Sequence, residues 1–468
     1  MLYNKNKVVY YYITHKSTIR RTALAYTFKG GIYVDDHKRT SRCAIEAVTD
    51  PPIVKISMNH TYGTPATPTV KVGDSVKIGQ VIGDGPESEL GCPVHASVSG
   101  KVLTIEEILS DNGTTETAVV IENDCEGTVH ESVIPFTGSI TSLSREEIIN
   151  TIRRAGIVGM GGEGYPTHEK IRAAVGKAEY LIVNCAESEP FATADHRLLL
   201  EESRRVIGGV KILMRALGAP QAIIAVGDNK MNVIRKYEKG LRGQSMISVR
   251  VLKTKYPQGD ERQLVFALTG REISCGKAPV DAGCVILNPA TCAAVYTAFA
   301  EGMPLVRRVV TVSGDCVKNP ANLSVPVGCP VPHMLEHCGG LKRTPDKLIV
   351  GGPMTGKTRH NAEIYIKKST TALTLLSDKY SKKSKTPPVC IRCGKCVSIC
   401  PMRLMPAYIA SLSVKGDFKG AESLGAMSCI ECGACAYGCP GNVEITHHIR
   451  VAKEQIRQSD AHKDSEEI

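Results

Sequence analysis

The middle of the chain alternates short apolar runs with segments whose apolar residues recur at helical spacing. The runs AEYLIVN (178–184), QAIIAVG (221–227) and GCVILN (283–288) have the length and character of strands buried in a parallel sheet. The segment SREEIINTIRRAG (144–156) begins with serine, carries acids early and arginines late, and ends in glycine, which predicts a helix. We therefore expect an α/β layered domain over residues 139–305.

Two other regions have strand patterns. Within residues 31–138, TPTVKVGDSVKIGQVIGD alternates β-branched and polar residues between glycine turns, which predicts a small barrel or sandwich. This region resembles a lipoyl- or biotinyl-type domain, in which a lysine at a hairpin tip carries the cofactor. The corresponding PVHASVSG has no lysine before Lys101, so we predict a structural module. Residues 306–376 return to short strands (RRVVTVSG, KLIVGG, EIYIKK), which predicts a small α+β module.

The remaining segments differ in charge and polarity. Residues 1–30 are basic and contain no acid, and we expect either a flexible arm or an upstream start that adds little. Residues 377–389 are polar and basic and end in prolines, as linkers do. Residues 390–455 hold the closely spaced cysteines, and residues 456–468 are expected to be a frayed polar tail.

The cysteines near the end of the chain form a repeated motif. CIRCGKCVSICP (390–401) and CIECGACAYGCP (429–440) both read C-x2-C-x2-C-x3-C-P, the spacing of two-cluster ferredoxins. The alternative is a pair of zinc sites, but zinc usually takes paired knuckles with four ligands per ion rather than a repeated triple. The spacing therefore predicts two [4Fe–4S] clusters, which transfer single electrons.

In this motif the fourth cysteine of each run binds the other cluster. We expect Gly394 and Gly433 to let backbone amides approach the sulfurs, and the fourth cysteine of each run to open a helix. The predicted ligands are Cys390, Cys393, Cys396 and Cys439 for cluster one, and Cys400, Cys429, Cys432 and Cys435 for cluster two. The other ten cysteines have no ligand spacing and are expected to be buried, inert thiols.

The composition of the chain argues against a membrane-spanning protein and against a nucleic-acid-binding protein. The 468 residues are enough for several domains, and no apolar run reaches the ~18 residues of a membrane-spanning helix. The net charge is +11, but tryptophan is absent, aromatics are 5% and no basic helix carries interleaved aromatics, so we expect no nucleic-acid partner. Many cysteines without an export signal favour metal binding in the reducing cytoplasm.

The stretch GIVGMGGEGYPTHEK (156–170) contains the glycine pattern of a dinucleotide-binding fingerprint. A true fingerprint follows a strand, whereas a predicted helix precedes this one and the first strand comes after it, so the Rossmann interpretation fails. A glycine loop that leads into a helix can still hold a phosphate through backbone amides. We expect Pro166 in the first turn of that helix and Lys170 to face the anion.

Several long motifs together resemble a known family. GIVGMGGEGYPTHEKI, LIVNCAESEPFATADHRLLLEE and YPQGDERQLVFALTGREI are similar to the flavin- and NADH-binding subunit of respiratory complex I. They are more similar to the C subunits of Rnf complexes, ion-translocating ferredoxin:NAD+ oxidoreductases, as are KGGIYVDDHK, VPVGCP, GGPMTG and the cysteine runs, in unbroken order over about residues 28–455. The resemblance implies a lipoyl-like barrel-sandwich, a Rossmann-like FMN/NAD(H) domain, a β-grasp (soluble-ligand-binding) module and a helical two-cluster ferredoxin domain.

The resemblance also implies site residues. The glycine loop would hold the FMN phosphate and ribityl chain, the segment N-x-x-E-x-E-P would line the isoalloxazine and nicotinamide, a third loop would close over the nucleotide, and a fourth segment would lie near the flavin. The residues of the glycine loop are Gly159, Gly161, Gly162, Gly164 and Lys170, and those of the N-x-x-E-x-E-P segment are Asn184, Glu187 and Glu189. The residues of the third loop are Tyr256, Gly259 and Glu261, and those of the fourth segment are Asn288 and Thr291. Glu163 stands where the family usually has a small residue, and an acid there would repel phosphate or tune the flavin.

NADH exchanges two electrons as hydride, iron–sulfur clusters exchange one, and a flavin can do both. The resemblance therefore implies an NAD(H)-dependent oxidoreductase subunit that passes electrons between NAD(H), FMN and two [4Fe–4S] clusters. It would be peripheral, on the cytoplasmic face of the cell membrane, with integral and peripheral Rnf-type subunits as partners and ferredoxin reached through the complex. One alternative is a soluble paralogue that donates NADH electrons to proline reductase or cobalamin without ion pumping. Another is a non-enzymatic scaffold that only carries clusters.

Overall fold

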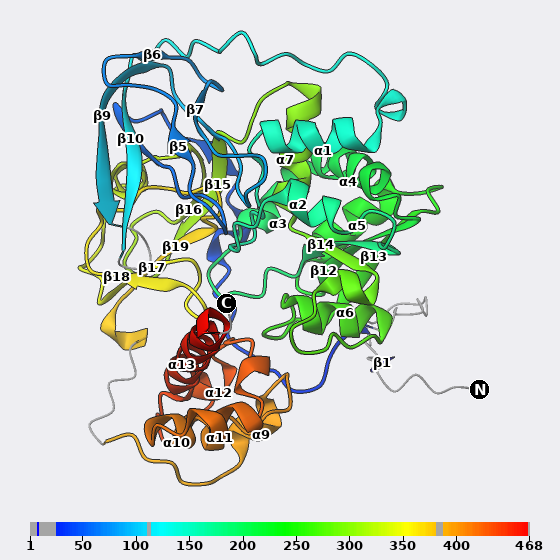
Figure 1. The fold of residues 1–468 in the computed structure, drawn as a ribbon, viewed down its shortest axis with the longest axis vertical. Coiled ribbons are helices and arrows are strands. Elements are labelled where there is room, and N and C mark those ends of the chain that lie inside the picture. Colours follow the sequence, from blue (N-terminus) through cyan, green and yellow to red (C-terminus); the bar gives the residue numbers. More distant parts are fainter. Residues whose placement is uncertain (1–6, 9–24, 110–113, 381–386, 467–468) are drawn as a thin grey trace, which may run out of the picture.

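The computed structural model describes residues 7–8, 25–109, 114–380 and 387–466. Four sheets and a helical C-terminal region build the described part of the chain. In Figure 1 the β-rich regions lie beside the α/β region, and the C-terminal helices α9 to α13 lie below both. No helix among the described residues is both long and apolar enough to cross a membrane.

The α/β region is built on parallel strands in the order β13-β12-β11-β14, and the predicted buried strands are confirmed. Most of the helices share one large apolar core with this sheet, whereas the helix that holds Leu264 and Val265 packs with the strands in a second core. The strands are β11 (Tyr180–Cys185), β12 (Gln221–Gly227), β13 (Ile247–Leu252) and β14 (Cys284–Leu287). The helices are α1 (Arg145–Arg154), α2 (Thr167–Arg172), α3 (Ala194–Glu201), α4 (Ser203–Leu217), α5 (Met231–Gly240), α6 (Glu261–Thr269) and α7 (Pro289–Ala300).

The helix predicted ahead of the glycine loop is α1. Ser144 caps it by accepting from the amide of Glu147, and the Glu147 carboxylate accepts from the amide of Ser144 at 2.7 Å, a capping box. Arg153 and Arg154 lie in its last turn, where cations favour the helix dipole. The glycine loop therefore follows a helix, which confirms the rejection of the Rossmann fingerprint.

The barrel-sandwich is made of two small sheets, β4-β10-β9-β6 and β5-β7-β8, with an apolar core. Its strands are β4 (Ile53–Ser57), β5 (Thr67–Pro68), β6 (Ser75–Val76), β7 (Val81–Asp84), β8 (Val94–His95), β9 (Gly100–Leu109) and β10 (Thr115–Asn123). The expected start of this domain at residue 31 does not follow the sheets. Strand β3 (Ile45–Ala47) pairs instead with β16 of the third sheet, so the barrel strands begin at Ile53.

The third sheet has the order β18-β17-β19-β15-β16-β3 and one helix, α8, whose Met334 is fully buried in its core. Its elements after β3 are β15 (Arg307–Ser313), β16 (Ala321–Pro326), α8 (Val331–His337), β17 (Lys347–Val350), β18 (Lys357–Arg359) and β19 (Ala372–Leu376). The stretch EIYIKK, expected to be a strand, makes one isolated bridge from Tyr365 to Pro330 instead.

The C-terminal region is helical, with α9 (Lys395–Ile399), α10 (Pro406–Val414), α11 (Phe418–Ser423), α12 (Ala434–Tyr437) and α13 (Ile445–Glu466). Two expectations are wrong here. Cys400 and Cys439 come after helices α9 and α12 rather than opening helices. The tail is not frayed from residue 456, because α13 runs on to Glu466 and Ile456 is buried in line with Ile445 and Ile449 at helical spacing.

The first residues of the chain also enter the fold. Most of the predicted arm 1–30 lies outside the described residues, but β1 (Lys7–Val8) pairs with β2 (Ala25–Tyr26), and β2 adds to β13. Residues 28–42, which we name the strap, then cross to the C-terminal region, where the Gly31 amide donates to the Ile399 carbonyl at 2.8 Å. Residues 25–30 are therefore part of the folded structure and not of a free arm.

Candidate functional site

A cavity of about 300 Å³ lies at the carboxyl ends of β11 and β14, the usual position of ligand sites in parallel α/β sheets. Its walls come from the glycine loop, the segment that follows β11, the loop before α6, the third sheet and the C-terminal helical region. Nine of the thirteen predicted cofactor residues line it: Gly159, Gly161, Asn184, Glu187, Glu189, Tyr256, Gly259, Glu261 and Asn288. The topology thus gathers residues from four separate motifs.

The other four predicted residues do not line the cavity, and three of them fix the conformation and position of the glycine loop. The Gly164 carbonyl accepts from the Tyr62 amide of the barrel at 2.9 Å. The buried Thr291 hydroxyl accepts from the Met160 amide at 3.0 Å. Gly162, with φ of +114°, supplies a backbone turn that a side chain would strain.

Lys170 does not line the cavity, and its charge is already paired with two carboxylates. Its ammonium lies 2.8 Å from a Glu261 carboxylate oxygen and 3.0 Å from one of Glu163, and it donates to the Ile286 carbonyl. Burial lowers the pKa of Lys170, but the two carboxylates outweigh burial and hold its pKa above the usual value. The expectation that Lys170 simply faces an anion is therefore incomplete, because two acids compete with a phosphate for it.

We expect Glu163→Ala to tighten FMN binding about five- to tenfold, because one negative charge leaves the cluster around Lys170 and about 1 kcal/mol of repulsion toward a phosphate is removed. Fluorescence titration of apoprotein with FMN measures the effect. Glu169→Gln is the matched control, since Glu169 pairs with Arg172 on the same helix and does not line the cavity. Equal FMN affinity in Glu163→Ala and the wild type would show that the acid does not hinder the phosphate.

Glu187 lies in the cavity wall and caps α3. One of its carboxylate oxygens accepts from the Asp195 amide at 2.8 Å, and the other is buried without a hydrogen-bond partner among the described residues. Asp195, which sequence reasoning missed, accepts from the Asn288 side-chain amide at 2.7 Å. Burial, together with the nearby Glu187, raises the pKa of Asp195 to about 6. The second Glu187 oxygen lies 3.8 Å from the Lys38 ammonium, so its charge is balanced by that cation.

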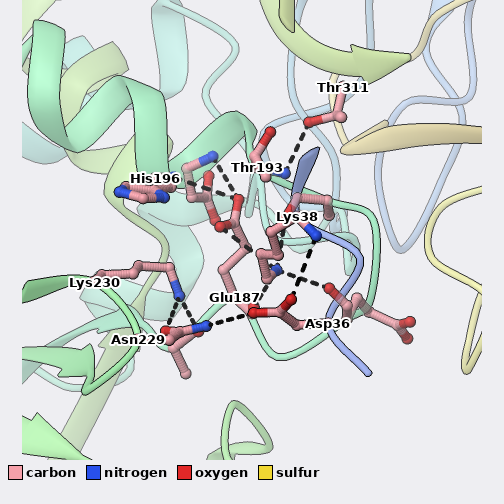
Figure 2. Close-up of polar contacts among 12 residues, drawn as sticks. Asp36, Lys38, Glu187, Thr193, His196, Asn229, Lys230 and Thr311 are labelled. Carbon is pink, nitrogen blue, oxygen red and sulfur yellow. Dashed lines mark hydrogen bonds and ion pairs between the residues drawn. The ribbon is translucent and has the colours of Figure 1, made fainter. Parts of the chain in front are cut away.

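Two buried lysines, also missed, fix the segment that contains Glu187 (Figure 2). Lys38 of the strap donates to the carbonyls of Glu187, Glu189 and Ala192 at 2.6–2.9 Å and lies 3.8 Å from the Glu187 carboxylate. Lys230 donates to the Ala186 carbonyl at 2.7 Å, and burial lowers its pKa to about 8. These bonds hold the backbone at Glu187, whose φ of +42° is unusual for a residue with a side chain.

Glu189 has a role beyond the one implied by the family resemblance. It lines the cavity, but its carboxylate accepts from the amides of Met354 and Thr355 at 3.0 and 2.9 Å and from the Thr355 hydroxyl at 2.5 Å. Its oxygens are thus engaged by the loop between β17 and β18. Glu189 therefore ties the α/β region to the third sheet in addition to lining the cavity, and its role toward a nicotinamide stays a prediction.

The four cysteines predicted for cluster two line a second, smaller cavity. Backbone amides donate to two of the sulfurs, Leu404 to Cys400 and Glu431 to Cys429, each at 3.4 Å. Such amide-to-sulfur bonds stabilise the thiolates of an iron–sulfur site. We name this the cluster-two cavity and the first the flavin cavity, each after its predicted ligand. Cys432 and Ile430 line both, so the two cavities share a wall.

The cysteines predicted for cluster one lie toward the surface, with Cys390 and Cys393 exposed and Cys396 and Cys439 half-buried. The two cysteine runs nevertheless repeat one backbone conformation. Positive φ values recur at Arg392 and Glu431, at Gly394 and Gly433, and at Arg403 and Asn442. Within the described residues no group of three His, Cys, Asp or Glu side chains is arranged to hold a single metal ion.

Comparison with known proteins follows the same division of the chain. Residues 26–126 match a family described as the RnfC barrel sandwich hybrid domain and residues 152–297 the Nuo51 FMN-binding domain. Residues 309–358 match the SLBB domain and residues 382–440 a 4Fe–4S dicluster domain. The predicted FMN and two [4Fe–4S] clusters are confirmed at this level.

Similar proteins cover nearly the whole chain. It is 40% identical over 432 residues to the C subunit of the Na(+)-translocating ferredoxin:NAD(+) oxidoreductase complex of Acetobacterium woodii, covering 92% of this chain and 97% of that protein. Identity is 38% to the proton-translocating counterpart of Clostridium ljungdahlii, covering 85% and 86%. It is 35% to the C subunit of the ion-translocating oxidoreductase complex of Rhodobacter capsulatus, covering 96% and 87%. The chain therefore belongs to the C-subunit family of ion-translocating ferredoxin:NAD(+) oxidoreductase complexes, the Rnf complexes.

Proposed function

We propose that this chain is the NAD(H)-dependent electron-transfer subunit of an Rnf-type complex, linking NAD(H), FMN and two [4Fe–4S] clusters. The observation that carries the proposal is the wall shared by the flavin cavity and the cluster-two cavity at Cys432 and Ile430. When bound, FMN supplies the step between two-electron hydride exchange and single electrons. In this proposal the chain places the flavin site, an inner cluster site and an outer cluster site in series.

The residues around the first cavity would act on the flavin nucleotide without reacting themselves. Backbone amides of the glycine loop would hold the phosphate, with Lys170 behind them. Asn184 would hold the loop before α6 in place at the cavity, since its side-chain amide donates to the Gly259 carbonyl at 2.8 Å. Glu187, in the wall of the same cavity, would help to orient the ring of the ligand.

The position of the cluster-one cysteines suggests where electrons enter or leave. Cys390 and Cys393 are exposed, and apolar side chains beside them, including Val389 and Ile391, are more than half exposed. We therefore place the contact with another subunit at this end, with further integral and peripheral subunits beyond it and ferredoxin reached through them. The chain would be peripheral, on the cytoplasmic face of the membrane.

The finer domain assignment is also proposed. The hairpin β15–β16, helix α8 and strand β19, which is parallel to β15, support a β-grasp module over 306–376. The packing of α10 and α13 around one core supports a ferredoxin-type helical domain from residue 390. The two facing sheets from Ile53 to Asn123 support a lipoyl-like domain.

Reconstitution of the full chain with FMN, iron and sulfide tests the function. We expect bound FMN, about eight iron atoms per chain and NADH-dependent reduction of a dye acceptor. A chain that binds no flavin and reduces no dye with NADH would end the proposal and favour the cluster-carrying scaffold. Co-purification with integral membrane subunits distinguishes it from the soluble paralogue, which the relatives, named as subunits of ion-translocating complexes, do not favour.

A further inference from the structure

One tyrosine bridges the flavin cavity and the wall that it shares with the cluster-two cavity. Tyr256 is 3% exposed and lines the flavin cavity in the loop that precedes α6. Its hydroxyl points away from that loop and donates to the backbone carbonyl of Cys432 at 2.6 Å. One side chain thus joins the α/β region to the backbone of a predicted cluster-two ligand.

The backbone of Tyr256 is fixed from the other side by the strap. The Tyr256 amide donates to the Ile32 carbonyl, and the Ile32 amide donates to the Tyr256 carbonyl, both at 2.8 Å. Ile32, Tyr256 and Ala434 then share a small apolar core that also contacts Cys432. The tyrosine is therefore held rigidly, and its hydroxyl is a placed donor rather than a mobile one.

The loop that holds Cys432 is anchored on one side by α13, where Lys453 donates to the Cys429 carbonyl at 2.7 Å and pairs with Glu431. The Tyr256 hydroxyl adds a directional bond to the Cys432 carbonyl on the side that faces the flavin cavity. Through this bond the loop before α6 positions the Cys432 backbone.

We propose that Tyr256 is a positioning residue that sets the separation and coupling between the flavin and cluster two. The inference rests on the proposed function. Electron transfer falls steeply with distance, and hydrogen bonding around a cluster ligand shifts the reduction potential of the cluster. Loss of the hydroxyl would free the Cys432 carbonyl and loosen the shared wall, while the aromatic ring would still fill the apolar core.

Tyr256→Phe in the reconstituted full-length chain tests this. Stopped-flow spectroscopy with NADH separates flavin reduction from cluster reduction, and EPR-monitored titration with dithionite measures the cluster-two potential without NADH. We expect cluster reduction to slow about tenfold relative to flavin reduction, the change that losing one buried hydrogen bond can produce, and the cluster-two potential to shift. Tyr237→Phe is the matched control, because the Tyr237 hydroxyl is buried and has no hydrogen-bond partner within the described structure.

The outcomes separate the two proposals. A Tyr256→Phe protein with wild-type cluster reduction and wild-type cluster-two potential overturns the role of Tyr256. So does loss of FMN with an unchanged cluster potential, which would make Tyr256 a flavin-binding residue only. If NADH fails to reduce the wild-type clusters but dithionite reveals a shifted potential in Tyr256→Phe, the proposed function fails and the contact of Tyr256 with cluster two stands.

Discussion

Cys432→Ala is expected to stop NADH electrons from reaching the clusters while FMN stays bound. Cys432 is a predicted cluster-two ligand and lies in the wall that both cavities share. Without it, cluster two should not assemble, and the iron content should fall by about half. NADH should still reduce the flavin, because the glycine loop lies outside the change. Iron analysis, EPR of the dithionite-reduced protein and stopped-flow measurement of cluster reduction report the three effects.

Two further variants serve as a control for Cys432→Ala and as a test of the order of the two clusters. Cys275→Ser alters an exposed cysteine without ligand spacing and should behave as the wild type. Cys393→Ala removes an exposed ligand of the outer cluster, and NADH should still reduce the inner one. If Cys432→Ala kept full iron and normal cluster reduction, the ligand assignment would be wrong. If Cys393→Ala blocked reduction of the remaining cluster, the order of the two clusters would be reversed.

Lys38→Met is expected to destabilise the α/β region by about 3–5 kcal/mol and to release FMN. The change keeps the apolar stem but removes the charge that serves the carbonyls of Glu187, Glu189 and Ala192. The Glu187 carboxylate would also lose the nearby cation 3.8 Å away, and breaking a buried pair costs more than the pair contributes. Chemical denaturation followed by circular dichroism gives the loss of unfolding free energy, and ultrafiltration gives the FMN retained.

Lys29→Met is the control for that change. Lys29 belongs to the same strap, but its side chain is exposed, so the substitution should alter unfolding by less than about 0.5 kcal/mol. Lys38→Arg keeps the charge but replaces a compact ammonium by a planar fork, and we expect partial retention of FMN. Equal stability of Lys38→Met and the wild type would mean that the three carbonyls find other donors, and the strap would lose its positioning role.

Local patterns were sufficient for the elements that frame the site. The apolar runs ending at Asn184 and Asn288 became adjacent parallel strands, and the Ser144 cap marked the helix that precedes the glycine loop. Both features depend on residues close together in sequence. Because the ends of adjacent parallel strands meet at one edge, the cavity follows from them once the order of the strands is known.

The interactions that fix the site join residues far apart in the chain, and no local pattern reveals them. Lys38 and the Glu189 carbonyl are 151 residues apart, and Tyr256 and Cys432 are 176 apart. In the sequence, Lys38 lies in a polar segment and resembles any solvent-exposed lysine. The family motif predicts that Glu189 lines the nicotinamide site and gives no sign of its bonds to Met354 and Thr355. Only the packing of the third sheet against the α/β region reveals those partners.

The two errors in the C-terminal region have different physical origins. The fourth cysteine of each run was expected to open a helix, yet the preceding residues, four or five long, already form one turn that ends just before it. The polar composition after residue 455 masked the spacing of Ile445, Ile449 and Ile456, which keeps α13 helical through its buried face. In the tail, the spacing of the apolar residues outweighed the polar composition.

The two sets of cysteines differ in exposure, and this difference determines which cluster oxidants would damage first. In the isolated chain Cys390 and Cys393 are exposed to oxidants and chelators, whereas Cys400 and Cys435 are buried. Damage would therefore begin at the outer cluster and leave an intermediate in which the flavin and the inner cluster still exchange electrons. Such a protein would go on oxidising NADH with small, soluble acceptors after it had lost its connection to the rest of the complex.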